Sequence, residues 1–141
     1  MPQLIRALAF MQMIEEGLRL YVGTAEELIA AAVPYGVPFR VDRKRIHRAA
    51  LGTIITMFEK VNRNAELIGH LNKLLEHRNY LAHVAFMHTI RGIHDESIDL
   101  EYAKTHAIAL GDQAEQLLFL IDQEMRSLLL NFPNPPTSSR V

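Results

Sequence analysis

Apolar side chains recur every three or four positions over most of the 141-residue chain, the spacing of helices that bury one face. The first apolar stripe predicts a helix from about Leu4 to about Val33, which Gly23 could interrupt and Thr24 could restart. This helix must end near Val33, because the segment VPYGVPF supplies two prolines and a glycine.

The same spacing predicts three further helices, separated by the polar turn NRN and by the loop RGIHDES. These helices run from an N-cap at Asp42 to Val61, from about Ala65 to about Met87, and from a cap at Ser97 or Asp99 to about Leu130. No segment alternates with the period of a strand. We therefore expect an all-α protein: an up-and-down bundle of four to five helices forming one domain over residues 1–132, then a flexible, proline-rich tail over 133–141.

Composition narrows the chemistry that such a bundle can perform. The net charge of −1 argues against a surface-wide field for nucleic acid or anionic membrane, although a local patch is compatible with it. The absence of cysteine excludes disulfides, thiolate nucleophiles, cysteine zinc sites and iron–sulfur clusters, and favours the cytoplasm. No apolar run approaches the roughly 20 residues that span a bilayer, and no signal-peptide cleavage site follows the apolar N-terminus, so we expect no membrane association.

Eleven of the fifteen basic residues are arginines, and five basic residues crowd into positions 39–48 against a single acid, Asp42. Arginine presents a planar fork of donors that suits phosphate, and a helix N-terminus also attracts anions. The segment is therefore a candidate RNA-binding patch, and the alternative is a solvated helix end. The candidate residues are Arg40, Arg43, Lys44, Arg45 and Arg48.

Seven histidines raise the question of a metal site. Two histidines on one helix usually chelate an ion when they are three or four positions apart, and no pair in this sequence has that spacing. No Glu-x-x-His motif of the di-metal type is present either. The sequence therefore predicts no metal and no other cofactor.

The segment LLEHRNYLAHVAF, residues 74–86, holds the most specific cluster of polar groups. Asn79 and His83 are four positions apart and share a helix face, and the long stem of Arg78 can swing toward them. Apolar neighbours surround His83, which indicates burial in the bundle or against a partner. The alternative is that the three polar side chains face water while the leucines face the core.

The sequence Arg78-Asn79-Tyr80-Leu81-Ala82-His83 resembles the R-x4-6-H motif of HEPN-domain proteins, including the polar residue after the arginine. The segment ALGTIITMFEK, residues 50–60, is similar to the LG-containing helix that often precedes this motif. The resemblance covers the motif helix well and the preceding helix loosely. The remainder of the chain is similar in architecture alone.

The resemblance implies a homodimer in which two motif helices meet and form a shared cleft, with metal-independent endoribonuclease activity. His83 would then be the general acid or base, Arg78 would hold the scissile phosphate, and Asn79 would orient one of them or bind the phosphate. Some toxin members carry a tyrosine two residues after the motif histidine as a target for antitoxin modification. Ala85 occupies that position here, so this mode of regulation is not expected.

Three hypotheses follow for the function. The first is a HEPN-type ribonuclease or toxin-like protein of defence or stress, with a possible cognate antitoxin. The second is a non-catalytic HEPN-like module for dimerisation, RNA binding or toxin–antitoxin partner binding. The third is a bundle that holds a small ligand in its core.

Overall fold

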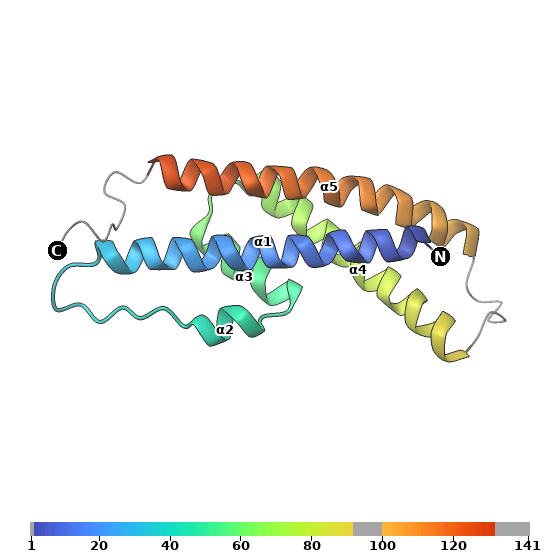
Figure 1. Cartoon of the computed structure of the whole chain (residues 1–141), viewed down its shortest axis with the longest axis horizontal. Coiled ribbons are helices and arrows are strands. Elements are labelled where there is room, and N and C mark those ends of the chain that lie inside the picture. Colours follow the sequence, from blue (N-terminus) through green and yellow to red (C-terminus); the bar gives the residue numbers. More distant parts are fainter. Residues whose placement is uncertain (1, 92–99, 132–141) are drawn as a thin grey trace.

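The computed structural model describes residues 2–91 and 100–131, and this part of the chain forms five helices and no strand (Figure 1). The helices are α1 (Pro2–Ala32), α2 (Arg43–Arg48), α3 (Leu51–Val61), α4 (Ala65–Arg91) and α5 (Leu100–Asn131). The predicted all-α bundle is therefore confirmed. The predicted tail at 133–141, the cap at Ser97 or Asp99 and the side chain of Phe86 lie outside the described residues.

The bundle is elongated because α1 and α5 each have more than 30 residues, which corresponds to roughly 45–50 Å of helix (Figure 1). These two helices run in the same direction, and α4 runs in the opposite direction (Figure 1). Helix α1 contacts each of the other four helices, so it forms the centre of the fold. The core around it includes the fully buried side chains of Phe58, Ile14, Leu18 and Leu71.

Small residues allow α1 and α5 to approach each other closely. A Cβ atom added to Gly111 of α5 would lie 3.9 Å from the Cα atom of Ala7 and would meet the guanidinium of Arg6. Ala7 itself is completely buried. Arg6 then spans the seam and forms ion pairs with Asp112 at 3.2 Å and Glu115 at 3.3 Å.

The single helix predicted from Asp42 to Val61 is wrong, because the chain breaks at Ala49 and Ala50 into α2 and α3. The predicted N-cap is nevertheless present: a side-chain oxygen of Asp42 accepts a hydrogen bond from the Arg45 amide at 3.0 Å. Ile46 and Leu51 are both buried, yet on one continuous helix they would point about 140° apart. The break lets both side chains enter the same core.

Arg19 of α1 stabilises this break. Its guanidinium donates a hydrogen bond to the Ala49 carbonyl at 2.8 Å and forms ion pairs with Glu15 and Glu16. Only 18% of the Arg19 side chain is exposed. The carbonyl at the end of α2 therefore gains a charged donor, which strengthens the hydrogen bond.

The predicted turn at Asn62–Asn64 connects α3 to α4, and a polar network fixes it to the long helices. Asn62 donates to the Tyr21 hydroxyl at 3.1 Å and to the Glu124 carboxylate at 3.2 Å. Asn64 donates to Glu124 at 2.6 Å and caps α4 by accepting from the Leu67 amide. Burial raises the pKa of the Tyr21 phenol; the hydrogen bond with Asn62 opposes that shift, and the Glu124 charge adds to it.

Replacing Gly111 with leucine should destabilise the fold by about 1–3 kcal/mol, because the side chain would force α1 and α5 apart. The matched change Gly69→Leu should stabilise it by about 0.5–1 kcal/mol, since an added Cβ at this exposed helical position would meet nothing within 4 Å. Urea unfolding would measure both values. Equal effects at the two positions would contradict the close approach of α1 and α5.

Tyr21→Phe should make the protein less sensitive to alkaline pH. Because the folded-state pKa of Tyr21 is raised, its stabilising contribution is present below pH 10 and is lost as the pH rises through the folded value. The free energy of unfolding of the wild type should therefore fall more steeply above pH 10 than that of the variant. Identical pH profiles would show that Tyr21 is not protected from ionisation.

Candidate functional site

The three motif residues lie on α4, and the structure divides them between two sides of that helix. Arg78 is partly buried and lines a cleft between α4 and α1, together with Met11, Gln12 and Glu15. Asn79 and His83 are exposed on the outer face. One contact joins the two groups: an Arg78 amino group donates to the Asn79 side-chain oxygen at 3.4 Å.

Burial within the bundle, one of the two kinds of burial considered from the sequence, does not occur for Asn79 and His83 in the single chain, whereas Arg78 is partly buried. Leu81 and Val84 occupy the core side of α4, so Asn79 and His83 must point the other way. The apolar residues that surround His83 in sequence are therefore neighbours along the chain and do not enclose it. For Asn79 and His83 the single chain shows the alternative considered from the sequence, in which they face water while Leu74 and Leu81 face the core. Of the two kinds of burial considered, only cover by a partner is compatible with this arrangement.

Arg78 and His83 are five positions apart, which separates them by about 140° around a regular helix. Arg78 lies next to α1, whereas His83 faces outward, so one chain does not bring the two side chains onto one surface. A reaction that needs both groups at one phosphate would require a second copy of α4 or a large movement of the Arg78 side chain.

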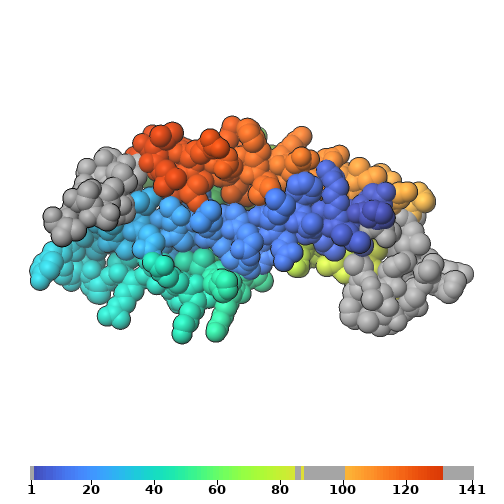
Figure 2. Space-filling view, viewed as in Figure 1, coloured from blue at the N-terminus to red at the C-terminus, as the bar shows by residue number. Residues whose placement is uncertain are grey.

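The predicted basic patch lies along the whole of α2 and in the extended segment before it. Figure 2 shows long side chains from this region projecting beyond the body of the molecule. Arg40, Lys44, Arg45 and Arg48 are exposed, as the RNA-binding hypothesis requires. The N-terminus of α2 is already capped by Asp42, so the exposed cations, rather than the backbone amides, are the groups available to an anion.

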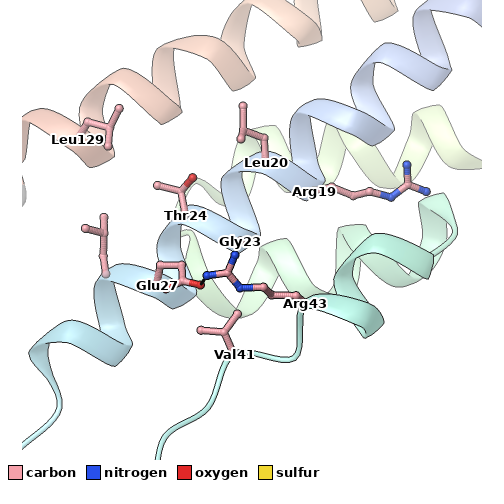
Figure 3. Close-up of a pocket in the computed structure, with 9 residues that line it drawn as sticks. Arg19, Leu20, Gly23, Thr24, Glu27, Val41, Arg43 and Leu129 are labelled. Atoms are coloured by element: carbon pink, nitrogen blue, oxygen red, sulfur yellow. Dashed lines mark hydrogen bonds and ion pairs between the residues drawn. The ribbon is translucent and has the colours of Figure 1, made fainter. Parts of the chain in front are cut away.

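Arg43 differs from the other four cations because it contacts the protein itself. Its guanidinium forms an ion pair with Glu27 of α1 across a groove lined mainly by apolar side chains (Figure 3). The groove also contains Val41 and Leu129 and has a volume of about 460 Å³. This groove lies on the surface beside the basic patch. The hypothesis of a small-ligand protein, in contrast, places the ligand in the core of the bundle.

The structure also brings together a cluster of aromatic side chains from two helices, which the spacing of residues along one helix could not reveal. His77 of α4 and His106 of α5 lie with their ring centroids 4.5 Å apart, and Tyr80 and Tyr102 flank them. Burial lowers the pKa of His106, and the neighbouring His77 lowers it further. The only sequence signal for this cluster is that aromatic residues recur at helical spacing on both segments.

Two features of the described residues bear on the remaining predictions. Over 2–91 and 100–131, no group of three or more histidine, aspartate or glutamate side chains is arranged to hold a metal ion. Within the same ranges, no helix has both the length and the apolar character needed to cross a bilayer. The side chains of His88 and His94 lie outside the described residues.

Comparison with known proteins identifies no relative: the chain matches no protein-family model, no curated protein and no solved structure. The functional argument therefore depends on the residues of this chain.

Proposed function

We propose that the chain is one subunit of a homodimeric, metal-independent endoribonuclease of the HEPN type, acting as a toxin-like protein. The observation that carries this proposal is the exposure of Asn79 and His83 on the outer face of α4, where a substrate or a second copy can reach them. Their neighbour Arg78 lies at the edge of the adjacent cleft.

The chemistry needs a group that can move a proton near neutral pH and a fixed positive charge. A neutral His83 removes the proton from a ribose 2′-hydroxyl, and the resulting oxygen attacks the adjacent phosphorus. The bond from phosphorus to the 5′-oxygen breaks, and that oxygen takes up a proton from a protonated histidine. The products are a 2′,3′-cyclic phosphate and a 5′-hydroxyl, formed without a metal ion.

Arg78 stabilises the extra negative charge that develops on the phosphate during the attack. Asn79 contacts Arg78 and can hold its guanidinium or donate a hydrogen bond to the phosphate. Because Arg78 and His83 point to different sides of one helix, two chains related by a two-fold axis would supply the pair. The second His83 would also provide the separate acid and base that the two proton transfers need.

A second function is favoured by the exposed cations before and within α2. In this alternative the chain binds RNA or a partner such as a cognate antitoxin without cutting RNA. Arg78, Asn79 and His83 then only join two subunits. The two functions differ in whether His83 is needed for a chemical step.

Purified protein should cleave single-stranded RNA in the presence of EDTA, and His83→Ala should reduce the rate by about 10²–10⁴-fold, the usual contribution of a general acid or base. His70→Ala, on the same helix with a partly exposed side chain, is the matched control and should retain full activity. Fragments ending in a 2′,3′-cyclic phosphate would confirm the reaction.

Equal cleavage by the wild type and His83→Ala, or no cleavage by either, would exclude the catalytic function. Light scattering on the same samples reports the oligomeric state. The joining role would be favoured if Arg78→Ala were monomeric but cleaved RNA at the wild-type rate at a high protein concentration, where the dimer can form again.

RNA binding should depend on salt through the cations of α2. Changing Lys44, Arg45 and Arg48 to serine should reduce the slope of log K against log salt by about 2, since each phosphate contact to a single strand contributes about 0.7. Serine at Lys60, Arg63 and Arg126, which are equally exposed elsewhere, removes the same charge and is the control. An equal decrease in both triple variants would rule out a localised patch.

A further inference from the structure

A hollow opens where the turn between α3 and α4 meets the C-terminal half of α5. Its volume is about 730 Å³, which lies within the usual range for small-molecule sites. Tyr21 of α1 also lines it, so three elements far apart in the sequence meet around one space. Neither the candidate catalytic residues nor the basic patch contributes to this space.

Two opposite charges line the hollow, and neither has an ionic partner. Glu124 is half-buried, and its carboxylate oxygens accept hydrogen bonds from the side-chain amides of Asn62, at 3.2 Å, and Asn64, at 2.6 Å. Arg63 also lines the hollow and is exposed. Over residues 2–91 and 100–131, Glu124 and Arg63 form no ion pair with each other or with another side chain.

This arrangement differs from other charged contacts of the bundle, in which an arginine and an acid pair directly. Arg6, Arg19 and Arg126 each lie within ion-pair distance of a carboxylate. The amides that hold Glu124 are neutral, so they fix its position and leave its negative charge uncompensated. A half-buried charge attracts an opposite charge more strongly than a charge in bulk water, because the local dielectric constant is lower.

A ligand with only one charge suits this pair of residues poorly. An anion at Arg63 is repelled by Glu124, and a cation at Glu124 is repelled by Arg63. A small molecule that carries both an ammonium and a carboxylate group compensates both residues at once. The charges of the hollow therefore favour a zwitterion.

The remaining walls supply an apolar surface and a further hydrogen-bonding group. Val61 and Leu128 contribute half-buried aliphatic side chains. The Ser127 hydroxyl accepts a hydrogen bond from the Asn131 amide at 3.0 Å and keeps its own proton for a ligand oxygen. These groups fit a short hydrocarbon chain next to a carboxylate.

We propose that this hollow binds a small zwitterion with an aliphatic side chain, of the α-amino-acid class. The ammonium group donates to the remaining lone pairs of the Glu124 carboxylate. The ligand carboxylate accepts from the Arg63 guanidinium and the Ser127 hydroxyl. The hydrocarbon chain packs against Val61 and Leu128.

The hollow is distant from the candidate catalytic residues. Arg63 precedes the first turn of α4, whereas His83 lies eighteen residues beyond Ala65, which corresponds to about 27 Å along the helix. The proposed site therefore adds a binding function that does not depend on RNA cleavage.

Isothermal titration calorimetry on the full chain tests the site with three probes. These are L-leucine, isocaproate, which is leucine without the amine, and isoamylamine, which is leucine without the carboxylate. L-leucine should bind saturably, and each analogue should bind at least about tenfold more weakly, because it leaves one charge of the hollow without a partner.

Two variants separate the ends of the ligand. Arg63→Gln should weaken L-leucine binding between about tenfold and about 100-fold, the usual loss of a hydrogen bond to a charged group, and should leave isoamylamine binding unchanged. Glu124→Gln should weaken L-leucine binding to a similar extent and should not weaken isocaproate binding. Lys60→Gln removes a positive charge at an exposed position outside the hollow and should leave all three affinities unchanged.

Three results would each overturn the site: no saturable binding of L-leucine, equal affinity for the three probes, or full L-leucine affinity in both Arg63→Gln and Glu124→Gln. Glu124→Gln also alters the contacts with Asn62 and Asn64 and could loosen the turn. Arg63 is exposed and has no partner within the described ranges, so its substitution keeps the fold intact. Thermal unfolding followed by circular dichroism checks that this variant is folded.

Discussion

The close packing of α1 against α5 is the constraint on which the rest of the fold depends. Gly111 and Ala7 let the two longest helices approach each other, and Arg6 closes the edge of the seam with its two ion pairs. Because α1 also contacts α2, α3 and α4, its position determines where each of them can bury its apolar side. The remaining helices are arranged around this pair.

Polar contacts from the long helices then determine where the shorter elements begin and end. Arg19 holds the carbonyl at the end of α2, and Tyr21 and Glu124 hold the turn before α4. The Arg19 guanidinium thereby gives the Ala49 carbonyl a partner, and the Tyr21 hydroxyl and Glu124 carboxylate give the Asn62 side-chain amide a partner. Near the core these polar groups would otherwise lack one. They fix the direction in which α4 leaves the turn, and with it the side of the molecule on which its outer face lies.

Helix α4 carries the residues on which the proposed function depends. Asn79 and His83 face away from the core, Arg78 lies at the edge of the cleft with α1, and Tyr80 leans toward α5. One helix therefore presents an imidazole, a cation and an aromatic ring in three directions. The proposed reaction uses His83 and Arg78 together only when a second chain and an RNA strand complete the arrangement.

Periodicity in the sequence was enough to determine the long helices α1 and α4, the turn at Asn62–Asn64 and the cap at Asp42, because these depend on residues that are close in the chain. The motif residues Arg78, Asn79 and His83 could be selected in the same way. Their exposure, the break at Ala49 and the meeting of His77 with His106 were decided by tertiary structure alone. Each depends on which side of a helix is covered by a partner distant in sequence, and spacing within one segment carries no information about that partner.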